Sequence, residues 1–204
     1  MYLIVGLGNP GMSYRKTRHN VGFLSLDLLA SRANIKIKSK GFSALYGEGF
    51  LHGERVILVK PQTYMNNSGD CVQQILHFYK LDPSRLIVLY DDIDLPVGSL
   101  RIRSSGTGGS HNGMRSILAC IHSEAFPRIR IGIGKDDSLL LRDYVLKRPS
   151  KDEQALLAES FAHAADAAEM IVAGQIEKAQ ALYNKKHEAS QSESIDNSKT
   201  KPQE

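Results

Sequence analysis

Asparagine, histidine and aspartate side chains recur in this sequence at the points where predicted strands end. Asn9 follows an apolar strand, His19-Asn20 come shortly after it, and Asp91 closes a second apolar strand. Two further groups, Asn66-Asn67 and His111-Asn112, directly precede predicted helices. Open α/β folds place their sites at the carboxyl ends of strands, so we expect these residues to lie together.

These side-chain types suit hydrolysis by an activated water molecule. A neutral imidazole takes up a proton near pH 7, and a carboxylate can fix its tautomer and stabilise the imidazolium. Asparagine amides can donate to a developing oxyanion or bind a substrate amide. Each residue also has a structural interpretation, because asparagines before helices are usually N-caps and a lone histidine is more often a structural hydrogen bonder. The residues alone predict a hydrolase-like site without a defined substrate.

The aspartates leave a metal-dependent alternative open. Asp91, Asp92 and Asp94 could bind a divalent ion together with His19 and His111. Oxygen and imidazole ligands suit Mn²⁺ or Mg²⁺. A metal-dependent hydrolase is therefore a second hypothesis, and a non-catalytic RNA-binding module with a structural His19 is a third.

Two familiar motifs are disfavoured, the first by its context and the second because it is incomplete. Residues 6–11 have the GxGxxG spacing of dinucleotide-binding loops, and Asp27 falls where a ribose-binding acid is expected. However, Pro10 removes a donor, and residues 12–20 lack the helical period that such a loop requires. Ser110 lies among glycines but lacks the last glycine of GxSxG, which disfavours covalent serine catalysis.

The elements that must position the site alternate between strands and helices. Apolar runs and alternation predict strands within residues 2–5, 56–59, 86–90, 100–103 and 128–133, with hairpins over 35–60. Helical spacing predicts helices over 21–34, 72–79, 114–121, 150–174 and 176–183, and Ser150 with Glu153 has capping-box spacing. We therefore predict one three-layer α/β/α domain over residues 1–187, with a twisted, mixed but mostly parallel sheet.

Charge and composition restrict the partners. The 204 residues carry a net charge of +4. Residues 188–204 hold two lysines and four acidic residues, so the rest of the chain carries +6 and favours a polyanionic partner. We expect this polar, acidic tail to be disordered. Cys71 and Cys120 have no metal-binding spacing and predict a reduced pair, and no leader or membrane segment is visible, so we expect a cytoplasmic protein.

At the candidate residues the sequence closely resembles bacterial peptidyl-tRNA hydrolases. The matching segments follow the order of that family from residue 3 to about 185: residues 3–11, 14–22, 60–69, 91–98, 109–113 and 128–134. The resemblance implies a monomeric esterase without metal or cofactor. The implied substrate is peptidyl-tRNA, and neither DNA nor a membrane is expected as a partner. The implied role is to recycle tRNA by cleaving the ester between a peptide and the 3′-terminal ribose.

The resemblance also implies a role for each matching residue. His19 is the expected general base that activates water, and Asp91 is expected to orient His19 and support its basic form. Asn9 matches the residue that separates N-blocked from free aminoacyl-tRNA. Side chains that match substrate contacts are Tyr14, Tyr64, Asn66 and Asn112.

Basic side chains in and just after the predicted strands 100–103 and 128–133 are expected to face tRNA phosphates. This band comprises Arg101, Arg103, Arg128, Arg130 and Lys135, among which Arg103 and Arg130 are the expected phosphate contacts. Two segments depart from the family pattern. Residues 104–110 contain more serine and threonine than glycine, and residues 139–141 are three leucines where a tRNA-contacting lysine is expected, so that Arg142, Lys147 or Arg148 could substitute.

Overall fold

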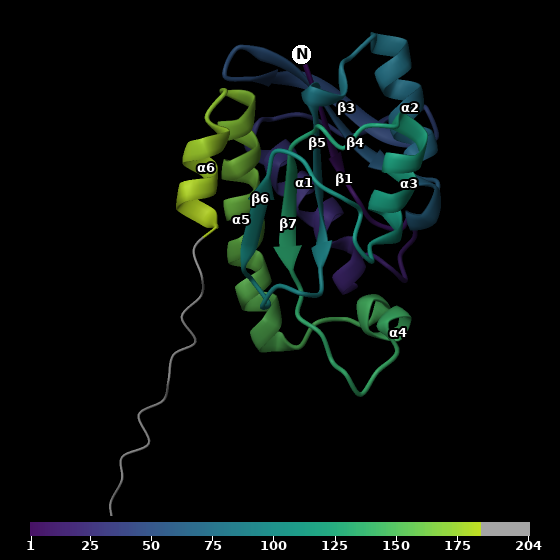
Figure 1. The fold of residues 1–204 in the computed structure, drawn as a ribbon, viewed down its shortest axis with the longest axis vertical. Coiled ribbons are helices and arrows are strands. Elements are labelled where there is room, and N and C mark those ends of the chain that lie inside the picture. The colour runs from purple at the N-terminus through teal and green to yellow at the C-terminus, as the bar shows by residue number, and fades with distance from the viewer. Residues whose placement is uncertain (185–204) are drawn as a thin grey trace, which may run out of the picture.

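The computed structural model describes residues 1–184, which form a single seven-stranded sheet covered by helices on both faces (Figure 1). The strand order is β2-β3-β4-β1-β5-β7-β6. The central strands β4, β1, β5 and β7 are parallel, whereas β2, β3 and β6 pair antiparallel at the edges. The bounds are β1 Tyr2–Gly6, β2 Ser39–Gly41, β3 Ala44–Leu51, β4 Glu54–Pro61, β5 Leu86–Asp92, β6 Leu100–Arg103 and β7 Arg128–Gly132. The predicted mixed, mostly parallel sheet is confirmed.

The helices form two layers. Helices α2 (Ser68–Tyr79) and α3 (Asn112–Ile121) cover one face of the sheet, and α1 (Val21–Arg32), α5 (Lys151–Val172) and α6 (Ile176–Tyr183) cover the other (Figure 1). Three short 3₁₀ turns complete the chain: η1 Arg18–Asn20, η2 Met65–Asn67 and η3 Pro83–Arg85. The three-layer prediction is therefore confirmed for the described residues.

Side-chain alternation along the central strands divides the apolar core in two. In β1, Leu3 and Val5 pack toward α2 and α3, whereas Ile4 packs toward α1 and α5. Successive strand residues point to opposite faces, and a strand covered on both faces must be apolar throughout. This explains why β1 and β5 read as uninterrupted apolar runs.

The glycines of the first loop serve packing. Helix α1 begins at Val21, well beyond Gly11, so the helix start that a dinucleotide loop needs is absent there. A Cβ at Gly6 would lie 2.4 Å from the carbonyl oxygen of Gly22, because α1 packs directly on the sheet. Asp27 forms an ion pair of 2.8 Å with Lys60. The start of α1 at Val21 thus supports the prediction that residues 6–11 are not a dinucleotide-binding loop.

In the second half of the chain, one predicted helix start is confirmed and one helix was not predicted. The capping box of α5 is present, since Ser150 Oγ accepts the Glu153 N–H and Glu153 accepts the Ser150 N–H. Helix α4 (Leu141–Leu146) was not predicted, because its six residues are too few to show a helical period. Within residues 1–184 no helix is long and apolar enough to cross a membrane, and both cysteines are free. The predicted tail over 188–204 lies outside the described residues.

Candidate active site

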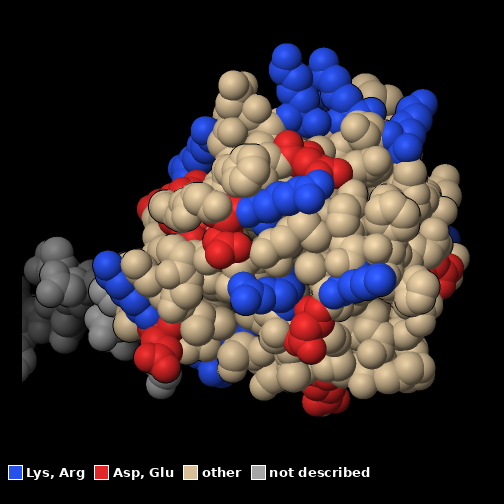
Figure 2. Space-filling model, turned by 90° about the horizontal axis from the view of Figure 1, so that it is seen from above, with Lys and Arg blue, Asp and Glu red and all other residues tan. Residues whose placement is uncertain are grey.

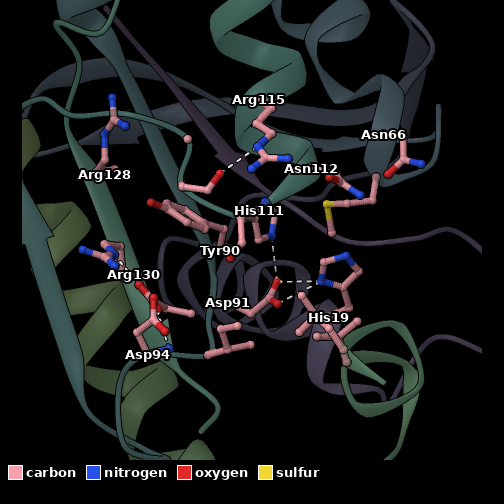
Figure 3. A pocket seen from close by; sticks show the side chains of 18 of the residues that line it. His19, Asn66, Tyr90, Asp91, Asp94, His111, Asn112, Arg115, Arg128 and Arg130 are labelled. Atoms are coloured by element: carbon pink, nitrogen blue, oxygen red, sulfur yellow. Dashed lines mark hydrogen bonds and ion pairs between the residues drawn. The ribbon is translucent and has the colours of Figure 1, made fainter. Parts of the chain in front are cut away.

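A cavity of about 830 Å³ lies at the carboxyl ends of β1 and β5, where the sequence placed the site (Figure 3). Asn9 follows β1, Asp91 is the second-last residue of β5, and His19 comes from η1. The loop over residues 105–110 and the start of α3 form one wall, and α4 contributes Leu141, Arg142, Val145 and Leu146. Segments far apart in sequence thus enclose one space.

Two histidines share one buried carboxylate. His19 Nδ1 lies 2.9 Å from both oxygens of Asp91, and His111 Nε2 lies 3.0 Å from Oδ1 of the same side chain. Figure 3 shows both rings pointing at Asp91, His111 from above the carboxylate and His19 from beside it. The backbone N–H of Met114 donates to His111 Nδ1 at 3.2 Å, so the ring proton of a neutral His111 is on Nε2 and is donated to Asp91.

The charges of this cluster reinforce one another. Burial alone raises the pKa of Asp91, but the imidazoles of His19 and His111 outweigh it and hold the pKa well below its usual range. Burial lowers the pKa of His19, and the Asp91 carboxylate more than reverses this effect and raises it. Because Asp91 holds the proton on Nδ1, the other nitrogen of His19, Nε2, carries the lone pair that can accept a proton.

The predicted aspartate cluster does not form. Asp92 points away from Asp91 along the strand, pairs with Arg130 and accepts the N–H of Asp94 at 2.9 Å. In residues 1–184 the group with metal-ligand spacing is instead His19, Asp91 and His111, whose ligand atoms lie within 4.8 Å of one another. Its donor set fits a metal poorly, since the Met114 N–H keeps the proton of His111 on the nitrogen that would have to bind.

Asn9 is held rigidly at the floor of the cavity. Its backbone N–H donates to Asn20 Oδ1 and its backbone carbonyl accepts from Asn20 Nδ2, each at 2.9 Å. Its side-chain Oδ1 accepts the N–H of Met65 at 2.8 Å. The amide nitrogen of Asn9 has no acceptor among the described residues, so it remains as a donor for a bound group. Asn20 and Asn67 occupy N-cap positions without making the predicted side-chain cap bonds.

The remaining predicted substrate residues separate into two groups. Tyr64, Asn66 and Asn112 line the cavity. Tyr14 does not line it but packs edge-on against Tyr64, with ring centroids 6.4 Å apart. Tyr64 also takes a φ of +59°, a conformation that is strained for a side chain of its size and that clusters at functional sites.

The predicted basic band is only partly correct. Arg103, Arg128 and Arg130 line the cavity, whereas Arg101 and Lys135 do not. Arg128 is wrong as a phosphate-facing residue, because it is 1% exposed and its guanidinium is bound to backbone carbonyl oxygens. The opposite end of the molecule, far from α4, carries both charge signs side by side (Figure 2).

Two arginines at or near the site were not singled out by the sequence analysis. Arg18 is the first residue of η1 and is buried against the start of α5, where it binds both oxygens of Glu153 at 2.9 and 2.7 Å and stacks on Tyr144. Arg115 lines the cavity from α3. A basic residue next to the predicted base was the available signal for Arg18, and the helical spacing that placed Met114 and Ile117 inward was the signal that Arg115 faces outward.

The fold and the site define a class of protein. A parallel-sheet α/β scaffold holds an imidazole backed by a buried carboxylate next to amide donors, and this arrangement is that of a hydrolase that activates water. Comparison with known proteins gives the particular family. A family model described as peptidyl-tRNA hydrolase matches residues 3–191, and the chain belongs to this family. Its activity is accordingly the hydrolysis of peptidyl-tRNA.

Individual relatives agree. The chain is 53% identical to a peptidyl-tRNA hydrolase of Alkaliphilus metalliredigens over 184 residues, which cover 90% of this chain and all of the relative. It is 47% identical to one of Clostridium botulinum (strain Alaska E43), covering 90% and 96%. A crystal structure of the peptidyl-tRNA hydrolase of Acinetobacter baumannii has a TM-score of 0.85 at 37% identity, covering 89% and 93%. The fold expectation, the enzyme class and the family are therefore confirmed.

Proposed function

We propose that this chain cleaves the ester bond between a peptide, or an N-blocked aminoacyl group, and the 3′-terminal ribose of tRNA, with water as the nucleophile and His19 as the general base. The observation that carries the proposal is the 2.9 Å contact between His19 Nδ1 and Asp91. This contact fixes the ring proton on Nδ1 and leaves Nε2 free to take a proton from water.

The reaction follows from this tautomer. His19 Nε2 takes a proton from a water molecule whose oxygen attacks the ester carbonyl, and the carbonyl oxygen becomes an oxyanion. Asp91 stabilises the imidazolium electrostatically while it stays ionised, as its low pKa requires. When the tetrahedral intermediate collapses, the ribose oxygen leaves with the proton from His19. Free tRNA and a peptide with a terminal carboxylic acid result, and the acid loses its proton to solvent.

Amide donors are available for the oxyanion and for the peptide. Asn9 Nδ2 has no acceptor among the described residues, and Asn112 lines the same cavity. Preorganised donors of this kind stabilise charge that develops in the transition state. We assign to Asn9 the discrimination between N-blocked and free aminoacyl groups, and to Tyr64 and Asn66 contacts with the substrate, with Tyr14 supporting Tyr64 from behind.

In this proposal the RNA lies on the side of the cavity that Arg103 and Arg130 line. Arg103 is exposed, and Arg130 uses its Nε for Asp92, which leaves its terminal nitrogens for a phosphate. We propose that the enzyme works as a cytoplasmic monomer on tRNA and needs neither metal nor cofactor, because an ester is an activated substrate that a base and a water molecule can cleave.

The direct test is single-turnover hydrolysis of N-acetyl-aminoacyl-tRNA by the purified protein in the presence of excess chelator. Free aminoacyl-tRNA and the His19→Ala variant serve as parallel reactions. Release from the blocked substrate alone, lost in the variant, supports the reaction and the base. Release that requires added metal would instead favour a metal-dependent hydrolase.

A further inference from the structure

In the loop over residues 106–110, the backbone carbonyl oxygens are hydrogen-bonded within the protein whereas most of the backbone N–H groups are not. All four carbonyl oxygens from Gly106 to Gly109 accept a hydrogen bond from a donor of the protein. Arg128 binds those of Gly106 and Thr107 at 2.5 and 3.0 Å, the His111 N–H binds that of Gly108 at 3.1 Å, and Arg115 Nε binds that of Gly109 at 2.7 Å. The protein thus pairs every one of these carbonyls, although Gly106 and Gly108 are only half-buried and Thr107 and Gly109 are exposed.

The amide groups of the same loop are left unpaired. Within residues 1–184, the N–H groups of Thr107, Gly108, Gly109 and Ser110 have no acceptor. A trans peptide points its C=O and its N–H in opposite directions, so each of these N–H groups points away from the donor that holds the preceding carbonyl. All four residues line the cavity that contains His19. Successive backbone N–H groups in a turn can together bind an anion.

Arg128 gives an independent indication of negative charge in the ligand. Its guanidinium is buried, yet no carboxylate of the described residues lies within ion-pair distance, and its Nε has no hydrogen-bond partner. Burial of an unpaired charge is costly, and the carbonyl dipoles of the loop compensate for it only in part. Burial accordingly lowers the pKa of Arg128. The loop therefore carries uncompensated positive potential next to the cavity.

The glycines allow the loop to lie close to Arg115 and Arg128, which flank it in Figure 3. Gly106 and Gly109 have φ values of +148° and +53°, which favour glycine. A Cβ at Gly108 would lie 3.0 Å from the backbone nitrogen and from Cγ of Arg115. A side chain at Gly108 would push the loop away from Arg115, and a side chain at Gly106 or Gly109 would strain the backbone.

We propose that residues 106–110 form a phosphate-binding loop that receives a phosphodiester of the RNA close to its 3′ end on the free N–H groups of residues 107–110. The ligand class rests on the function proposed above, because the loop shares a cavity with the base that attacks the 3′-terminal ester. Arg128 is then a positioning residue, which turns the amides outward and does not itself contact the RNA.

The test uses the whole protein labelled with ¹⁵N and two probes, a deacylated minihelix of a tRNA acceptor stem and inorganic phosphate. We expect the amide resonances of residues 107–110 to move downfield with the minihelix, and those of the β3–β4 turn at Gly53 to stay in place. Shifts elsewhere in the cavity without movement of these four amides would overturn the proposal. Because neither probe can be cleaved, the result is independent of whether the protein is a hydrolase.

A matched pair of variants tests one donor. Thr107→Pro removes the N–H of residue 107, whereas Thr107→Ala removes only the hydroxyl and keeps the N–H. We expect Thr107→Pro to weaken minihelix binding about tenfold relative to Thr107→Ala, with an unchanged salt dependence, since a neutral donor to a charged group is lost but no cation is. Equal affinities of the two variants would contradict the assignment.

The variant Arg128→Lys provides a second test of the loop that does not depend on whether Thr107→Pro folds. Lysine keeps the charge but cannot bind the carbonyls of Gly106, Thr107 and Glu124 with one planar fork. We expect the amide resonances of residues 107–110 to broaden or move in this variant before any ligand is added, and minihelix affinity to fall several-fold. Wild-type resonances and affinity would show that Arg128 does not orient the loop.

Discussion

Asn20 and Asn9 bind each other through two reciprocal hydrogen bonds of 2.9 Å, in which the amide side chain of Asn20 pairs with the backbone N–H and the backbone carbonyl of Asn9. Asn20 is adjacent to His19, so one short turn supplies both the proposed base and the clamp on the residue that faces the substrate. The neighbouring Arg18 ties the same turn to Glu153. Three consecutive side chains therefore contact helix α5, strand β5 and the loop after β1.

Asn20→Asp tests the clamp. The carboxylate still accepts the N–H of Asn9, but it offers no donor to the Asn9 carbonyl and places a charge in a site that is 2% exposed. We expect a loss of about 1–3 kcal/mol in the free energy of unfolding, together with weaker discrimination against free aminoacyl-tRNA. Urea unfolding and parallel hydrolysis of the two substrates measure these effects. Asn67→Asp, at an exposed position without a side-chain cap bond, is the control for stability.

His19→Ala separates chemistry from binding. A general base contributes about 10²–10⁴ in rate, so turnover should fall to this extent while the affinity for deacylated tRNA stays near that of the wild type. Single-turnover rates and filter binding are the measurements, and His77→Ala, on the exposed side of α2, is the matched control. An equal loss of rate and affinity would contradict the role of His19.

Asp91→Asn should change both the rate and its pH dependence. In the wild type, Asp91 raises the pKa of His19, so kcat/KM rises with pH through a pKa above the ordinary value of about 6.5. Without the carboxylate the imidazolium is less stable, the acid limb moves to lower pH, and the plateau falls about 10- to 100-fold. A pH–rate profile from pH 5 to 9 measures both. A plateau within twofold of the wild type is incompatible with this role.

The Arg18–Glu153 ion pair should stabilise the whole domain. The side chains are 7% and 23% exposed, and removing one partner of a largely buried pair leaves the other charge unpaired. We expect Arg18→Met to lower the free energy of unfolding by about 2–4 kcal/mol, as measured in urea. Asp166→Asn, which breaks the exposed pair with Arg32, should cost less than about 1 kcal/mol.

The same pair predicts a pH dependence of stability. Burial raises the pKa of Glu153, and hydrogen bonds from Arg18 and Ser150 outweigh burial and lower it. A lowered pKa means that this stabilisation is present above the unfolded value of about 4.3 and is lost as the pH falls through the folded pKa. The stability difference between wild type and Glu153→Gln should therefore disappear in acid. A difference that persists unchanged at pH 2 would contradict this assignment.

Salt should weaken RNA binding steeply if the arginines of the cavity contact phosphates. Each contact releases counterions, so Arg103→Gln should reduce the slope of log K against log salt by about 0.7–0.9. Arg85→Gln, at the end of the molecule where η3 precedes β5, should leave the slope unchanged. Fluorescence anisotropy between 50 and 300 mM salt distinguishes the two, and identical slopes for both variants would remove Arg103 from the interface.

The sequence alone determined the features that depend on local periodicity. Apolar runs identified β1 and β5, the Ser150–Glu153 spacing identified the start of α5, and the position of polar residues after strands located the site. These signals are reliable because a strand buried on both faces, a capping box and a strand end each impose a pattern on neighbouring residues. The segments shared with the family then identified the reaction.

Only the tertiary structure decided which partners these residues have. Arg128 looked like an exposed strand residue, but packing buries it beneath a loop whose carbonyls it binds. His111 looked like a helix start, and it also meets an aspartate 20 residues away. Asp92 was grouped with Asp91, although strand alternation and Arg130 turn it aside. Such pairings depend on how separate elements pack, and no local pattern in the chain records that packing.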